Sequence, residues 1–416
     1  MPSVQKRAGG ASRFLTQGFM TNTTTPSYHT VIKPSGAQCN LDCTYCFYLS
    51  KEGLLDQPKA PRMSDAVLEA HVRQYIESQS GPEVVFTWQG GEPTLMGLDF
   101  FARVVALQAK YQKPGQQVEN DLQTNGVLLD DRWAAFLKAN KFLVGLSIDG
   151  PEDLHDLYRR AKGGRPTFKS VMAAVDRLRR WEIPFNALCV VNNANGREPL
   201  RTYRFLRDEV RPRIIQFIPA VVPAQDRGDT TPKLGEPRTR PTTPASIVEP
   251  WSVDADDWGT FLATIWDEWF AQDYGTTFVD QFENVVSMMV RKGSQMCVTS
   301  PKCGRGLAIE FNGDLYSCDH FVYPQHHLGN ILDEDEGVLA RSAAQAAFGN
   351  AKMDTLTDFC KSCRFIELCW GECPKNRIIA APDGQDGLNY LCSGLKTFYG
   401  KATASYPQVV QRLSGS

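Results

Sequence analysis

The sequence of 416 residues has no apolar run of the roughly 18 residues that a membrane-spanning helix requires. Its first 28 residues also lack the apolar segment of a secretory signal peptide, and we expect them to form a flexible tail (1–28) on a cytoplasmic protein. An excess of positive charge is missing too, because 45 Lys and Arg residues are offset by 47 Asp and Glu residues. The sequence therefore indicates neither a membrane protein nor a partner of nucleic acids.

Cysteine, in contrast, is abundant, with 12 residues in a chain that is otherwise ordinary in composition. All but one of them fall into two groups, at 39–46 and 297–392. The remaining cysteine, Cys189, lies within the apolar run 185–191, where we expect a buried core thiol. Disulfides are unexpected in a reducing compartment, so the grouped cysteines indicate bound metal.

The first group consists of Cys39, Cys43 and Cys46, followed directly by two aromatic residues. A structural zinc site and most iron–sulfur clusters take four protein ligands. A [4Fe–4S] cluster held by only three thiolates keeps one iron free for a ligand that the protein does not supply. This group therefore predicts a cluster with an open coordination position.

Short apolar runs alternate with helical patterns from residue 29 onward, which is typical of βα units and a parallel sheet. We expect six strands, at 29–33, 84–88, 118–123, 142–148, 185–191 and 214–218. Helices are expected between them, at 64–79 with Ser64 as N-cap, 99–111, 131–140, 168–181 and 197–208. Polar motifs follow the first four strands, at the carboxyl ends where barrels of this kind gather their catalytic groups.

The rest of the chain divides by composition. Residues 222–250 contain six prolines and few large apolar groups, so we expect a flexible insertion after a core domain over 29–221. Amphipathic helices at 258–271 and 282–291 indicate a helical bridge over 251–296. A cysteine-rich domain over 297–395 and a C-terminal helix or tail over 396–416 complete the predicted organisation.

The second group contains eight cysteines: Cys297, Cys303, Cys318, Cys360, Cys363, Cys369, Cys373 and Cys392. Eight thiolates make two complete sets of four ligands, with no open position in either. Two [4Fe–4S] clusters and two structural zinc ions both satisfy this count. The residues by themselves leave both alternatives open.

The C-x3-C-x2-C pattern, with an aromatic residue before its third cysteine, resembles the motif of the radical S-adenosylmethionine (SAM) superfamily, in which the open iron binds SAM. The resemblance implies an α/β fold, a partial (β/α)6 TIM-like barrel, which agrees with the expected strands. It also implies SAM-binding roles for residues near the ends of those strands: Tyr45, Tyr48, Gln89, Gly90, Gly91, Glu92, Ser147 and Arg159.

Elementary chemistry supports several of these roles. Paired glycines let a backbone approach a ligand closely, and Glu92 can accept a hydrogen bond from an ammonium group. Arg159 can bind a carboxylate through two parallel hydrogen bonds, and the competing interpretation is an ordinary surface arginine. Tyr45 and Tyr48 are candidates to pack on the adenine, and the competing interpretation is a core role.

The second group of cysteines resembles the SPASM domain, the C-terminal extension of radical SAM enzymes that modify peptides. That resemblance implies one [4Fe–4S] cluster on Cys297, Cys303, Cys318 and Cys373 and another on Cys360, Cys363, Cys369 and Cys392. The protein would then carry three [4Fe–4S] clusters. Beside a radical SAM core, zinc becomes the less favoured alternative.

Further segments, at 47–48, 89–94, 122–126, 145–151 and 317–319, resemble the anaerobic sulfatase-maturating enzymes. That family uses a 5′-deoxyadenosyl radical to remove a Cβ hydrogen, converting an active-site Cys or Ser of a sulfatase to Cα-formylglycine. The resemblance implies a sulfatase polypeptide with a Cys/Ser-x-Pro-x-Arg segment as substrate, and an electron donor such as flavodoxin or ferredoxin. It also implies that Asp319 deprotonates the substrate. We expect an anionic cluster to raise the pKa of Asp319, and His320 is the competing base.

Two other functions stay open. A different SPASM enzyme would crosslink or epimerise a ribosomal peptide, but such enzymes often carry a leader-binding domain, and the 28 residues before the first strand are too few for one. A zinc-dependent interaction module without catalysis would need neither the open-iron motif nor the barrel.

Overall fold

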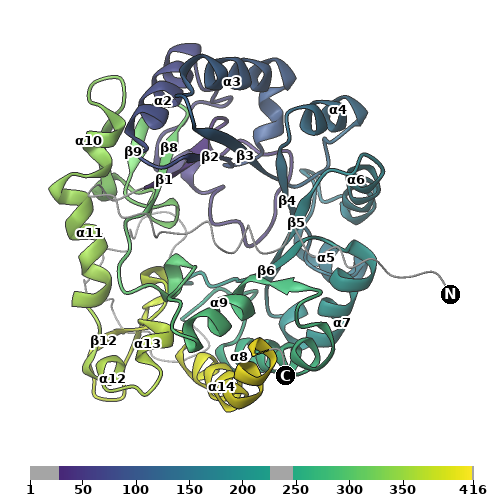
Figure 1. Cartoon of the computed structure of the whole chain (residues 1–416), viewed down its shortest axis with the longest axis vertical. Helices are drawn as coiled ribbons and strands as arrows, with labels where there is room; N and C mark the ends of the chain where they lie inside the picture. The colour runs from purple at the N-terminus through teal and green to yellow at the C-terminus, as the bar shows by residue number, and fades with distance from the viewer. Residues whose placement is uncertain (1–27, 225–246, 415–416) are drawn as a thin grey trace.

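The computed structural model describes residues 28–224 and 247–414 (Figure 1). The predicted tail, apart from residue 28, and residues 225–246 of the predicted insertion lie outside these ranges. None of the described helices has the length and apolar character that crossing a membrane requires.

The six predicted strands are all present and run parallel, neighbouring one another in chain order. They are β1 (His29–Lys33), β2 (Glu83–Trp88), β3 (Gln117–Thr124), β4 (Leu143–Ser147), β5 (Phe185–Val191) and β6 (Ile214–Pro219). Every second side chain is buried in β2 and β5, which is the alternation that a pleated strand imposes. The predicted partial (β/α)6 barrel is confirmed.

Helices cover the outside of this curved sheet (Figure 1). They are α2 (Asp65–Ser78), α3 (Leu98–Tyr111), α4 (Asp131–Ala139), α5 (Glu152–Tyr158), α6 (Phe168–Arg180) and α7 (Pro199–Arg204). The short helix α1 (Lys51–Leu54) follows the cysteine loop. The predicted N-cap is confirmed, because the Ser64 hydroxyl accepts a hydrogen bond from the Val67 amide at 3.3 Å. The sequence did not predict α5, which follows Pro151 and leads directly into Arg159.

Four more strands extend the sheet beyond the six predicted ones. β7 (Phe278–Val279) pairs with β6 at one edge, and β8 (Gly306–Glu310) pairs in parallel with β1 at the other. β9 (Asp314–Tyr316) and β10 (His327–Asn330) then continue the sheet in antiparallel fashion. The cysteine-rich region therefore shares one ten-stranded sheet with the barrel.

The predicted bridge forms α8 (Ala255–Glu268) and α9 (Asp280–Met289). The cysteine-rich region adds α10 (Glu336–Ala340), α11 (Ala343–Asp354), α12 (Asp358–Lys361), α13 (Ile366–Cys369), β11 (Ile379–Ala380) and β12 (Asp386–Leu388), and the chain ends in α14 (Cys392–Ala404) and α15 (Tyr406–Leu413). Helices α8 and α14 touch at paired glycines, where a Cβ atom on Gly394 would lie 1.8 Å from the Ala255 carbonyl oxygen. This contact fixes the helix that begins with the last cysteine.

Candidate active site

A cavity of about 720 Å³ lies between the barrel and the cysteine-rich region. It gathers most of the residues that the sequence singled out: Cys39, Cys43, Tyr45, Cys46, Gln89, Gly90, Gly91, Ser147, Arg159, Cys297, Asp319 and Cys373. Within this set, the cysteine loop, the glycine loop and Ser147 lie at the carboxyl ends of β1, β2 and β4, as the sequence predicted. Tyr48 and Glu92 are not among the residues that line the cavity.

The glycine loop after β2 packs directly on the loop that carries the three cysteines. The Gly91 amide donates to the Gly36 carbonyl at 2.8 Å, and a Cβ atom on Gly91 would lie only 2.0 Å from the Gln38 carbonyl oxygen. Gly90 has a φ of +121°, which disfavours any side chain. The glycines are thus needed for one loop to approach the other, and together the two loops form one wall of the cavity.

Glu92 lies beneath this wall, away from the cavity. It is fully buried, and its carboxylate accepts hydrogen bonds from the Thr94 amide (3.1 Å) and hydroxyl (2.6 Å), the Thr124 hydroxyl (2.8 Å) and the Asn125 amide (2.8 Å). Burial raises the pKa of the carboxyl and these donors oppose the rise. Glu92 therefore ties the ends of β2 and β3 together, and its contact with an ammonium group stays a prediction.

Cys39 and Cys43 of the first group lie in an environment that disfavours free thiolates. Burial raises the pKa of Cys39 to about 12 and that of Cys43 to about 11. Bound iron supplies the positive charge that deprotonates such thiols. The Leu41 amide donates to the Cys39 sulfur at 3.4 Å, and the Asn125 side-chain amide does so at 3.8 Å. The donor set therefore fits an iron–sulfur cluster.

Arg159 lies inside the protein, so the competing interpretation of a surface arginine is wrong. One terminal nitrogen donates to the Tyr45 hydroxyl at 3.0 Å, and that hydroxyl donates in turn to the buried Asp149 carboxylate. The Nε atom of Arg159 is buried without a hydrogen-bond partner in the part of the chain that the structure describes. A cation with a free donor at a cavity wall fits a carboxylate or ribose ligand.

Ser147 and Tyr48 differ in how well they suit SAM binding. The Ser147 hydroxyl accepts from the Gln123 side chain at 3.4 Å and faces the cavity. Tyr48 is almost fully buried, and its hydroxyl donates to Glu310 at the end of β8. The structure thus does not bring Tyr48 to the cavity, and its packing on adenine gains no support.

Asp319 forms an ion pair with Lys33, the last residue of β1. The Lys33 ammonium also donates to the Gln89 side chain at 3.1 Å and lies 4.5 Å from the centre of the Tyr48 ring. Burial raises the pKa of Asp319, but Lys33 and His320 lower it by more, so the net shift is downward. Lys33 therefore opposes the rise that an anionic cluster would cause, and the expectation of that rise stays a prediction.

Lys33 and Glu310 are functional candidates that the sequence reading missed. Lys33 could have been noticed in the sequence, because it is a charged residue at the carboxyl end of a predicted apolar strand. A lysine is rarely buried, and the structure shows that this one is. Glu310 had none, because β8 was not predicted. Burial raises the pKa of Glu310 to about 7, and its partners Tyr48 and Lys33 oppose the rise.

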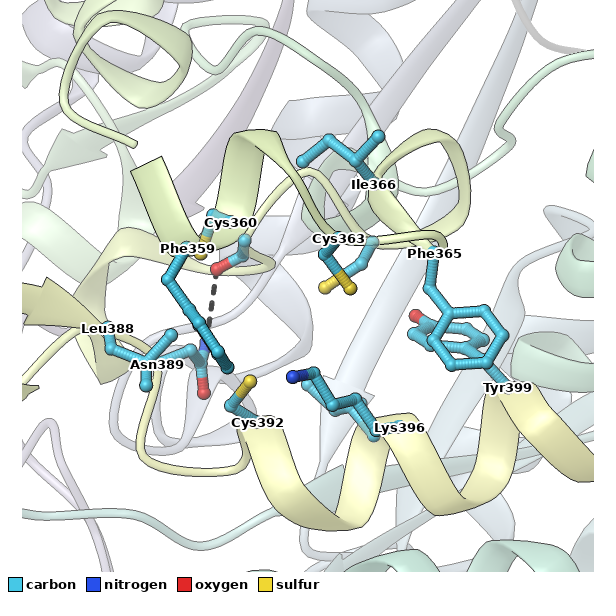
Figure 2. A pocket seen from close by; sticks show the side chains of 13 residues that line it. Phe359, Cys360, Cys363, Phe365, Ile366, Leu388, Asn389, Cys392, Lys396 and Tyr399 are labelled. Carbon is cyan, nitrogen blue, oxygen red and sulfur yellow. Dashed lines mark hydrogen bonds between the residues drawn. The ribbon is translucent and has the colours of Figure 1, made fainter. Parts of the chain in front are cut away.

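The eight later cysteines separate into two sets in space. The far set, Cys360, Cys363, Cys369 and Cys392, lines an apolar pocket of about 30 Å³ (Figure 2). Figure 2 shows the Lys396 side chain reaching between Cys363 and Cys392 from α14. This grouping agrees with the cluster assignment that the SPASM resemblance implied.

The cavity-side set comprises Cys297, Cys303, Cys318 and Cys373, and two of its members, Cys297 and Cys373, line the large cavity. Burial raises the pKa of Cys303 to about 12. Burial also acts to raise the pKa of Cys373, but the hydrogen bond and the charge of His320 together outweigh it and lower this pKa. His320, the competing base, thus contacts a thiol of this set.

Residues 28–224 and 247–414 contain no three His, Cys, Asp or Glu side chains close enough to share one metal ion. In a [4Fe–4S] cluster each thiolate binds a different iron, so the four sulfurs need not converge on one point. Thiols that surround a space fit this geometry better than the tight tetrahedron of a zinc site.

Comparison with known proteins agrees with this geometry. Residues 34–206 match the radical SAM superfamily, and residues 301–364 match the SPASM iron–sulfur cluster-binding domain. The chain is 40% identical over 373 residues to a serine-type anaerobic sulfatase-maturating enzyme of Bacteroides thetaiotaomicron, covering 89% of this chain and 88% of the relative. It is 32% identical over 378 residues to a cysteine-type enzyme of Clostridium perfringens, covering 90% and 96%.

The fold is also similar to that of solved structures. Native anSMEcpe with bound AdoMet and Cp18Cys peptide is similar with a TM-score of 0.78 at 30% identity, over 94% of this chain and 99% of that one. The likeness therefore extends over the barrel and the cysteine-rich region together.

Proposed function

The chain belongs to the anaerobic sulfatase-maturating enzymes of the radical SAM superfamily, and on this premise we propose that it oxidises an active-site Ser or Cys of a sulfatase polypeptide to Cα-formylglycine. The observation that carries the proposal is the single cavity that the three-cysteine loop, Arg159 and Asp319 share. Removal of a Cβ hydrogen and removal of a proton must act on one substrate residue, so both sets of groups must face the same space.

The first half of the reaction depends on the barrel wall. When bound there, the cluster and SAM supply the radical that removes a hydrogen atom from Cβ. Arg159 binds the carboxylate end of SAM, and Tyr45 holds Arg159 in place through the hydrogen bond between them. Gly90 and Gly91 let their loop pack against the cysteine loop, so that both loops line the site that SAM would occupy.

The second half depends on Asp319. Its carboxylate accepts the proton of the substrate hydroxyl or thiol, one electron leaves the substrate, and the C=O or C=S bond forms. With a cysteine substrate, water then hydrolyses the C=S group to the aldehyde and hydrogen sulfide leaves. Lys33 keeps the carboxylate ionised before the step. Cys318, which directly precedes Asp319, would be one of the four ligands of the cavity-side cluster, and that cluster could supply the electron acceptor.

The proposal extends to the substrate and its setting. A serine-containing Ser-x-Pro-x-Arg segment is the first to test, since the serine-type relative is 40% identical and the cysteine-type relative 32%. Flavodoxin or ferredoxin reduces the barrel cluster, and the reaction takes place in the cytoplasm, where exposed iron–sulfur sites and free thiols persist.

The test is incubation of the anaerobically reconstituted protein with SAM, a reductant and three matched peptides that carry Ser, Cys or Ala at the modified position. Mass spectrometry should find loss of two hydrogens from the Ser peptide and no change in the Ala peptide. Formation of a crosslink, or deuterium uptake at Cα without loss of mass, would instead support the alternative of a ribosomal-peptide enzyme.

A further inference from the structure

His320 lies between two of the cluster sites. Its Nδ1 atom is 3.5 Å from the Cys373 sulfur, and its backbone amide hydrogen-bonds the Cys318 thiol. The imidazole ring also meets the Phe47 ring edge to face, with centroids 5.4 Å apart, and Phe47 directly follows Cys46 of the first group. One residue thus contacts two thiols of the cavity-side set and a neighbour of the barrel cluster.

The direction of the hydrogen bond follows from the chemistry of the sulfur. A thiolate that binds iron has no proton to donate, so it can only accept. Nδ1 of His320 must then carry the hydrogen, whichever protonation state the other ring nitrogen has. Donors to the sulfurs of an iron–sulfur cluster favour its reduced form, because the added electron increases the negative charge on those sulfurs.

We propose that His320 is a positioning residue that raises the reduction potential of the cluster on Cys297, Cys303, Cys318 and Cys373, so that this cluster accepts the electron released during product formation. The inference rests on the proposed function only for the use of that electron. Asp319 and His320 are adjacent, so one turn receives both products of the oxidation step: the proton goes to the Asp319 carboxylate and the electron to the cluster that His320 contacts. The substrate carbon is oxidised and the cluster is reduced by one electron.

The far set supplies an internal comparison. Its Cys369 thiol receives a hydrogen bond from the Gly371 backbone amide, and Lys396 reaches between Cys363 and Cys392, whereas His320 is not among the residues that line its pocket. Substitution of His320 should therefore change the reduction potential of the cavity-side cluster and leave that of the far cluster unchanged.

The experiment is an EPR-monitored redox titration of the full-length chain, reconstituted under anaerobic conditions and carrying Cys43→Ala to remove the barrel cluster. His320→Leu should lower the equilibrium constant for one-electron reduction of the cavity-side cluster at least tenfold, which is a fall of 59 mV in its reduction potential. The reduction potential of the far cluster should stay unchanged. His320→Asn keeps a donor near the position of Nδ1 and should retain most of the wild-type value. His327→Leu, at a histidine paired with Asp314 at 3.1 Å, is the matched control and should change neither.

Equal reduction potentials in the parent and His320→Leu proteins would overturn the proposal. So would equal shifts of the reduction potential in both clusters, or a His320→Asn protein whose potential is as low as that of His320→Leu. If His320→Leu does not hold two full clusters, His320→Phe replaces it, because its ring can keep the edge contact with Phe47. The titration uses neither SAM nor substrate. A failure to form formylglycine would therefore overturn the proposed function without affecting this result.

Discussion

The two auxiliary cysteine sets have the same ligands but unlike surroundings. The cavity-side set lies beside ionisable groups: Asp319 follows one of its cysteines, His320 donates to another, and the buried Lys352 ammonium donates to the Cys297 carbonyl at 2.8 Å. The far set lies around a small pocket lined mainly by aromatic and aliphatic side chains, with Lys396 as the charged side chain that reaches between two of its cysteines. Charge near a cluster favours electron transfer, whereas an apolar enclosure favours retention of the cluster. The difference suggests that one set takes part in the reaction and the other stabilises the fold.

Loss of one ligand from each set gives the strongest contrast. Cys373→Ala should lower formylglycine formation by more than the roughly 100-fold that a lost outer-shell contact costs, while SAM cleavage continues. Cys363→Ala should retain part of its formylglycine formation but unfold at a lower temperature. Product and 5′-deoxyadenosine yields, measured on the same samples, separate the two effects. If Cys373→Ala and Cys363→Ala lose the same amount of product per folded protein, the two sets do not differ in their part in the reaction.

Asp319→Asn should affect the cavity side alone. Removal of a general base costs typically about 10²–10⁴-fold, so formylglycine should fall by that factor while 5′-deoxyadenosine still forms. Both auxiliary clusters should be retained, as iron and sulfide analysis will check. Asp314→Asn, on the neighbouring strand β9, is the control with an unchanged rate. A normal product yield from the Asp319 variant would rule out its role as the base.

The sequence predicted some parts of this site and not others, for physical reasons. The three cysteines and the two glycines were recognisable because their neighbours in the chain are also their neighbours in space. The contact of Lys33 with Asp319 was not, because it joins the end of β1 to a turn after β9, nearly 290 residues further along the chain, in a region for which no strand was predicted. The same contact bears on the pKa of Asp319, because the lysine opposes the rise that an anionic cluster would cause.

Gly394→Ala should act on the far set through packing. The new Cβ atom would lie 1.8 Å from the Ala255 carbonyl oxygen, and helix α14 carries Cys392 at its first position. Overpacking of this kind costs about 3 kcal/mol of unfolding free energy, and iron should be lost from the far set first. Gly400→Ala on the same helix meets nothing closer than 3.8 Å and should be close to neutral. Denaturant titrations that show equal stability for both variants would contradict the role of the α8–α14 contact.

Lys33→Met should produce the smallest change, one confined to the pH dependence of the cavity side. Burial raises the pKa of Asp319 and Lys33 is the first of the groups that lower it, so removal of the ammonium should raise this pKa. A base works only when deprotonated, so the rate of the variant should begin to fall at a higher pH than that of the wild type. Lys110→Met, at an exposed lysine paired with Glu69, should leave the profile unchanged. If the acidic limb of the pH–rate profile does not shift in Lys33→Met, this ion pair does not hold the base ionised. The polar character that separates the cavity-side set from the far set would then depend on His320 and Lys352 alone.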